Sequence, residues 1–171
     1  MYSFPIGVML ESFRLPAADA IRCAAELGVQ GIQMYCTYGE HAPENMTPEK
    51  RRELLDMVKS AGLRFSAICG DLGHGFGDAT LNPQLIEKSK RILDLSQDME
   101  AGIVTTHIGV IPTDPTHERY RIMQEACGQL AAYADSISAH FAVETGPETS
   151  VEYHLNSLSG YIHMYSASLC D

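Results

Sequence analysis

The sequence predicts an α/β protein built on a parallel sheet. Three observations support this prediction: short apolar runs recur along the chain, longer segments with helical spacing separate them, and Pro and Gly mark the junctions. Strands that alternate with helices are typical of parallel sheets whose strands are joined by helical crossovers. A chain of 171 residues that are 45% hydrophobic can bury a full core, so we expect one domain.

Five short runs rich in Val, Ile, Phe or Met are the expected strands. They are FPIGVML (4–10), GIQMYC (31–36), LRFSAIC (63–69), GIVTTHIG (102–109) and HFAVETG (140–146). Two architectures are possible for such a sheet: an open doubly wound sheet, or part of a (β/α)8 barrel. No GxGxxG motif follows the first run, so a dinucleotide-binding sheet has no support.

The segments between these runs are the expected helices. Proline stands at a plausible first helical position in four dipeptides, and in the last three a capping residue precedes it: Leu15-Pro16, Thr47-Pro48, Asn82-Pro83 and Asp114-Pro115. Glycine can adopt the left-handed conformation that ends a helix, and it marks three expected helix ends: Gly28, Gly62 and Gly102. The clearest apolar stripe recurs every three or four residues: Tyr120, Met123, Cys127, Leu130, Ala134 and Ile137.

Charge and composition exclude several classes of function. A net charge of −10 argues against a nucleic-acid partner, because binding to the phosphate backbone needs clustered Lys and Arg. No apolar run approaches the ~18 residues of a membrane-spanning helix, so we expect no membrane partner. The five cysteines are scattered and include no CxxC pair, which favours a reduced, cytoplasmic protein over a disulfide scaffold.

Polar residues stand near the ends of three expected strands. His74 lies in the glycine-rich loop GHGFG (73–77), His107 near the end of the fourth strand, and Glu144 at the end of the fifth. In a β-α barrel these ends meet at one rim, where the chemistry takes place. Imidazole and carboxylate suit a divalent metal such as Mn, Zn, Co or Mg.

Each of these residues also has a purely structural interpretation. Glu144 either points into solvent or has a role, because a buried carboxylate is costly unless it is paired or bound to a metal, and its apolar strand neighbours favour a role. His107 could be an ordinary rim residue, and His74 could be solvated in a flexible loop that lacks the lysine of a phosphate-binding loop. Glu11, just after the first strand, could line the same rim, but a solvated loop acid is the favoured interpretation.

Five segments resemble the sugar phosphate isomerase/epimerase family, the xylose-isomerase-like TIM barrels. They are GVMLESFR, AAELGVQGIQMY, ICGDLGHGFG, VTTHIGVIP and AVETGPET, and the likeness runs from about residue 4 to 150. The resemblance implies a partial (β/α)8 TIM barrel of five parallel strands. It also implies that Glu144 is a metal ligand and the catalytic acid or base, that His107 binds metal or lines the pocket, and that His74 lines the substrate pocket.

The same resemblance implies a reaction. Family members isomerise or epimerise a sugar or sugar phosphate by moving a proton next to a carbonyl through an enediolate, and a divalent metal stabilises its charge. A related superfamily branch contains AP-endonuclease-type proteins, which are metal-dependent nucleases.

The chain departs from the family in length and in its C-terminal composition. A complete barrel needs about 250 residues, and the family's Asp, His and Glu ligands on strands six to eight have no counterpart here. Residues 1–152 contain 33 of the 34 charged residues, whereas residues 153–171 have none before Asp171. We therefore divide the chain into a barrel part (1–152) and an atypical tail (153–171). We expect the tail to replace the usual sequence, as after a frameshift or premature stop, rather than to cap the sheet as a divergent strand and helix.

Three hypotheses of function follow. The first is an isomerase or epimerase whose chain is incomplete and whose divalent metal (Mn, Mg, Co or Zn) binds weakly. The second is a non-catalytic half-barrel that forms a homo-oligomer through its open sheet edges. The third is an AP-endonuclease-like nuclease, which the acidic charge balance argues against.

Overall fold

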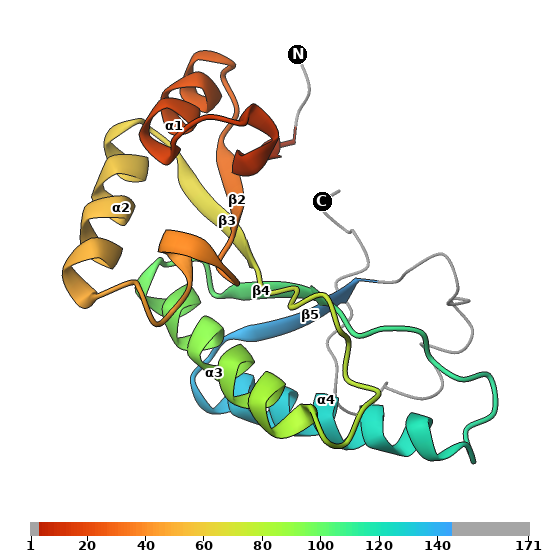
Figure 1. Cartoon of the computed structure of the whole chain (residues 1–171). Helices are drawn as coiled ribbons and strands as arrows, with labels where there is room; N and C mark the ends of the chain where they lie inside the picture. The colour runs from red at the N-terminus through yellow and green to blue at the C-terminus, as the bar shows by residue number, and fades with distance from the viewer. Residues whose placement is uncertain (1–3, 145–171) are drawn as a thin grey trace.

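The computed structural model describes residues 4–144, which form one curved parallel sheet with helices along its outer face (Figure 1). The strands are β1 (Gly7–Met9), β2 (Gly31–Tyr35), β3 (Arg64–Cys69), β4 (Ile103–His107) and β5 (His140–Glu144). The helices are α1 (Ala17–Glu26), α2 (Pro48–Ser60), α3 (Asn82–Asp98) and α4 (Glu118–Ser136), with short 3-10 helices η1 (Leu10–Phe13) and η2 (Gly39–His41). The strand order is β1-β2-β3-β4-β5 and every neighbouring pair is parallel, as expected for part of a TIM barrel.

The sheet is open over the part of the chain that the structure describes, with β1 and β5 as its edges. The expected strands are confirmed, but the first four are shorter than the apolar runs. The first run differs most, because Leu10–Phe13 forms η1 and ends at Arg14, which is left-handed with φ 55°. The division at residue 152 and the tail 153–171 lie outside the described residues.

Alternate residues of each strand face the helices and form the core. Ile32 and Met34 of β2 are fully buried, and Ile68 and Val104 occupy the equivalent positions on β3 and β4. One extra residue, Ser66, shifts the register between β2 and β3. The other face of the sheet is the inner face of the partial barrel. There Gln33 Nε2 donates to Thr105 Oγ1 at 2.8 Å, so the inner residues of β2 and β4 contact each other across β3.

The helix boundaries confirm some of the predicted signals and contradict others. Thr47 caps α2 and accepts a hydrogen bond from the Lys50 N–H, with Pro48 at the first helical position. The predicted cap Asn82 is instead the first residue of α3, and its amide donates to the Phe76 carbonyl. Asp114 accepts two hydrogen bonds from Thr116, one from its N–H and one from its hydroxyl, which delays the start of α4.

Other helix signals were accurate or displaced by one residue. Pro16 is the residue before α1 rather than its first. The three glycines Gly28, Gly62 and Gly102 have φ values of 75°, 75° and 68°, as predicted for left-handed helix ends. The buried residues of α4 include Met123, Cys127, Leu130 and Ala134, which confirms the predicted apolar stripe.

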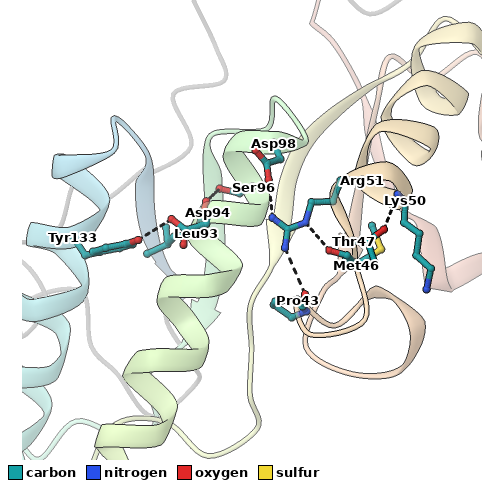
Figure 2. A network of polar contacts seen from close by, with 10 residues as sticks. All are labelled: Pro43, Met46, Thr47, Lys50, Arg51, Leu93, Asp94, Ser96, Asp98 and Tyr133. Atoms are coloured by element: carbon teal, nitrogen blue, oxygen red, sulfur yellow. Dashed lines mark hydrogen bonds and ion pairs between the residues drawn. The ribbon is translucent and has the colours of Figure 1, made fainter.

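Polar contacts join the helices to one another on the outer layer (Figure 2). Arg51 of α2 forms an ion pair with Asp98 at the end of α3, with Nη1 2.6 Å from Oδ2. Its Nε also donates to the Met46 carbonyl at 2.9 Å, and its side chain is only 18% exposed. Tyr133 of α4 donates to Asp94 of α3 at 2.7 Å. No helix within the described residues is long and apolar enough to cross a membrane.

Replacing Arg51 tests how much this contact stabilises the helical layer. We expect Arg51→Ala to lower the free energy of unfolding by about 1–2 kcal/mol, because it removes a mostly buried guanidinium that donates to backbone carbonyls. Lys59→Ala is the matched control: Lys59 pairs with Glu100 at 2.6 Å but is 50% exposed, so its loss should cost no more than about 0.5 kcal/mol. Urea unfolding of both variants makes the comparison, and equal losses would contradict this account.

Candidate functional site

The carboxyl ends of the five strands meet at one rim of the sheet. Four strands end in a polar or ionisable residue, and the first strand is followed by one two residues later. These residues are Glu11, Tyr35, Cys69, His107 and Glu144. Such a rim is where TIM barrels place their chemistry, because the loops that follow the strands surround it. We define these five residues as the rim set.

His107 and Glu144 are direct neighbours in the rim set. They are register partners at the ends of β4 and β5. Both lie on the inner face, because Thr105 and His107 are two residues apart on β4 and Thr105 faces Gln33 there. His107 Nε2 lies 3.3 Å from Glu144 Oε2, and the two side chains are 51% and 45% exposed. Glu144 is therefore not the buried carboxylate that its apolar strand suggests, and a solute can reach it.

The loop that carries His74 is held against the segment after β4. The Phe76 N–H donates to the Ile108 carbonyl at 2.9 Å, and Phe76 is buried. Gly75 has φ +62°, and a Cβ on it would collide with the Ile108 carbonyl, so glycine is required there. These contacts fix the position of Gly75 and Phe76 beside the segment after β4. His74 itself is exposed and remains a predicted substrate-pocket residue.

Glu11 belongs to the rim, the less favoured of the two interpretations that its sequence position allows. Its Oε1 accepts a hydrogen bond from the Tyr35 backbone N–H at 2.8 Å, and its Oε2 is buried with no partner among the described residues. A solvated loop acid would have neither feature, so that interpretation was wrong. The sequence offered one weak signal, an acid directly after an apolar strand.

Burial and neighbouring groups raise the pKa of two side chains in the middle of the rim, Tyr35 and Cys69. The neighbouring Cys69 and burial raise the pKa of Tyr35, and the nearby acids Asp71 and Glu11 add to the effect. Burial raises the pKa of the Cys69 thiol, and the Glu144 charge contributes in the same direction. Both groups therefore stay protonated and neutral near pH 7.

The rim residues supply fewer ligands than a divalent metal ion usually takes from a protein. The described residues contain no group of three or more His, Cys, Asp or Glu side chains placed to hold a metal ion. His107 and Glu144 offer one imidazole nitrogen and one carboxylate, a donor type that suits Mn, Co, Zn or Mg. Two donors fit part of a site, since divalent metals in proteins usually take at least three protein ligands.

Comparison with known proteins identifies the family. The model of the xylose isomerase-like TIM barrel family matches residues 21–166. This chain belongs to that family. A search of curated protein sequences gave no match.

Solved structures share the fold. A xylose isomerase domain protein from Planctomyces limnophilus superposes with a TM-score of 0.77 at 19% identity, over 92% of this chain and 59% of that one. A xylose isomerase-like TIM barrel protein from Mycobacterium smegmatis in complex with magnesium gives 0.63 at 17% identity, over 87% and 58%. A D-psicose 3-epimerase in the presence of D-fructose gives 0.64 at 13% identity, over 84% and 53%. The chain thus spans less than two thirds of the length of each of these proteins.

A buried thiol beneath the rim makes stability depend on pH. Burial, assisted by the Glu11 charge, raises the pKa of Cys36 from 9.0 to about 12. Between these values the unfolded chain loses this proton and the folded chain keeps it, so the free energy of unfolding falls as pH rises above 9. One thiol contributes a slope of about 1.4 kcal/mol per pH unit.

We expect Cys36→Ala to reduce that slope by about 1.4 kcal/mol per pH unit, because it removes one of the thiols that contribute to it. Urea unfolding between pH 9.5 and 11 measures the effect. Cys127→Ala is the matched variant, because burial raises the pKa of Cys127 to about 12 as well, and it should give a similar reduction. A slope that neither substitution changes would show that these thiols ionise in the folded chain.

Proposed function

We propose that this chain carries the β1–β5 part of a sugar isomerase or epimerase site in which Glu144 transfers a proton beside a carbonyl. The contact between His107 and Glu144 at the rim is the observation that carries the proposal. It joins an acid-base residue and a neighbouring imidazole on adjacent strands of a fold whose relatives include an epimerase.

The local geometry supports a proton-transfer role for Glu144. A general base must come within hydrogen-bond reach of the carbon acid, and the Glu144 carboxylate is about half exposed at the inner face. Without a metal, His107 with its proton on Nε2 can donate to Glu144 Oε2 and orient the carboxylate, whereas binding of a metal by this nitrogen would require the loss of that proton. His74 would line the pocket from the loop after β3.

A divalent ion is the proposed cofactor, with His107 and Glu144 as the ligands that this chain offers. When bound, such an ion supplies Lewis-acid stabilisation of the negative charge that develops on the substrate oxygen. The Mycobacterium smegmatis protein of the same fold, which was solved in complex with magnesium, supports this choice of ion. Because the described residues supply only two donors, we propose weak binding.

Metal titration tests the proposal. We expect the chain to bind Mn2+ with a dissociation constant far above that of a complete site, because the two donors leave most coordination positions to water. Glu144→Gln and His107→Ala should each abolish the binding that remains. Isothermal titration calorimetry and the Mn2+ electron paramagnetic resonance signal measure it.

His74→Ala is the control for the metal experiment, since His74 is assigned to the substrate pocket rather than to the metal. It should leave Mn2+ affinity unchanged. Mn2+ binding that survives Glu144→Gln at full strength would remove the basis for the proposed function.

Self-association through the open edges is a second part of the proposal. β1 and β5 are the edges of the described sheet, and unpaired strand edges recruit partners. Next to β1, Phe4 and Ile6 are 45% and 42% exposed. A cavity of about 270 Å3 lies on the inner face beside these residues, between β1 and the start of β3. The chain would therefore form a homo-oligomer that covers these surfaces.

Light scattering after size exclusion tests association. We expect a mass above 18.7 kDa at high micromolar concentration, and Ile6→Lys should shift it towards the monomer because a charge would be buried at the edge. Met57→Lys is the matched control: Met57 is 41% exposed on α2, which connects the inner strands β2 and β3, and its replacement should change nothing. A wild-type monomer at these concentrations would contradict the edge argument.

A further inference from the structure

A second cavity lies at the rim, at the carboxyl ends of β1 and β2. It has a volume of about 260 Å3, close to the lower end of the roughly 300–1,000 Å3 usual for small-molecule sites. Its walls are mainly apolar and aromatic, and they include Leu10, Leu15, Pro16, Tyr35, Tyr38 and His41. The cavity is thus suited to a small ligand with both apolar and polar surface.

Glu11 gives this cavity an unused hydrogen-bond acceptor. The carboxylate lines the cavity, and its Oε1 is held by the Tyr35 N–H at 2.8 Å. Its Oε2 is buried and has no partner among the described residues. A buried carboxylate oxygen without a donor is costly. A ligand that brings a hydroxyl or N–H group to Oε2 would remove that cost.

The charges around the cavity select against an anionic ligand. Glu11 and Glu40 both line it, and none of the described lining residues is Lys or Arg. His41 Nε2 lies 3.8 Å from a Glu40 oxygen, so the nearest ring nitrogen already faces an acid. A phosphate group carries about −1.5 to −2 charges near pH 7 and is bound through Arg, Lys or a helix N-terminus. The first turn of α1 borders the cavity, but Asp19 already occupies that turn.

The aromatic side chains suit a polyol. Tyr35 and Tyr38 lie with their ring centroids 5.9 Å apart and tilted by 37°. Tyr38 is 63% exposed, so its ring is available to a ligand. An aromatic face covers the C–H surface of a sugar while a carboxylate accepts from its hydroxyls, and the tyrosine hydroxyl offers both a donor and an acceptor.

The cavity lies on the same rim as the proposed reaction site, towards the β1 end. Tyr35 is a wall of the cavity and is the register partner of Cys69 at the end of β3. His107 and Glu144 end β4 and β5 farther along the same rim. A ligand whose reacting carbon lies near Glu144 can therefore extend its other end along the rim towards Glu11.

We propose that the cavity beside Glu11 binds the uncharged, hydroxyl-bearing end of the substrate, with a hydroxyl donating to Glu11 Oε2, and that this selects a free sugar over one phosphorylated at that end. The assignment rests on the proposed function for the identity of the ligand as a sugar. It makes Glu11 a specificity-determining residue, whereas Glu144 is the catalytic one.

Nuclear magnetic resonance titration of the full chain tests this assignment with D-fructose and D-fructose 6-phosphate as probes. The Tyr35 amide is the reporter, because it donates to Glu11. We expect D-fructose to shift the Tyr35 signal in a saturable way, and the phosphate ester to bind at least roughly 10-fold more weakly, since its charge meets two carboxylates. Tighter binding of the phosphate ester, or no shift of Tyr35 with D-fructose, would overturn the proposal.

Variants separate the role of Glu11 from a general effect on folding. Glu11→Gln replaces an acceptor and should weaken D-fructose binding roughly 10- to 100-fold, as for loss of a hydrogen bond to a charged group. Tyr38→Ala removes an exposed ring, leaves Glu11 in place and should also weaken binding. Glu26→Gln is the control, because Glu26 is exposed at the end of α1 and does not line the cavity, and it should leave D-fructose affinity unchanged. D-fructose affinity that is unchanged in both Glu11→Gln and Tyr38→Ala would overturn the proposal.

Glu144→Gln distinguishes this inference from the proposed function. It should abolish Mn2+ binding and leave the D-fructose shift at Tyr35, because the cavity lies at the other end of the rim. A D-fructose shift lost with Glu144→Gln but kept with Glu11→Gln would place the ligand elsewhere and overturn the assignment of Glu11.

Discussion

The in-phase alignment of parallel strands is the constraint on which the rim depends. Backbone hydrogen bonds hold β4 and β5 so that Ile103 pairs with His140 and His107 pairs with Glu144. Because side chains alternate between faces, a shift of one residue would turn one of the two last side chains towards the helices. The same alignment places Tyr35 beside Cys69 on β2 and β3. The sheet thus gathers groups that are far apart in sequence, and the helices on its outer face keep it in place.

The fold could be predicted from the sequence because its signals are local. Apolar runs, glycines at helix ends and the stripe on α4 all depend on a few neighbouring residues, and the structure confirms them. The errors have local physical reasons as well. Asn82 and Asp114 have the chemistry of helix caps, but each side chain bonds to a different partner within its loop. Tertiary and loop contacts outweighed the capping preference at both positions.

The site could be predicted only in part. His107 and Glu144 were identifiable because each ends an apolar run, and the structure places them 3.3 Å apart. Glu11 could be placed near the rim but not distinguished from a solvated acid, since its importance comes from a hydrogen bond to Tyr35, 24 residues away, and from burial of its second oxygen. Neither property has a sequence pattern. The contacts of the His74 loop could not be predicted for the same reason, because Gly75 and Phe76 contact a segment that follows another strand.

Disulfide trapping tests the alignment of β4 and β5 most directly. The double variant His107→Cys/Glu144→Cys places two thiols at register partners on the same face, within the range that a disulfide can bridge. The variant His107→Cys/Val143→Cys places them on opposite faces. Peptide mapping by mass spectrometry after mild oxidation identifies the bridge. The account predicts a disulfide between the two introduced thiols in the first variant and none between those in the second, whereas the reverse result would contradict it.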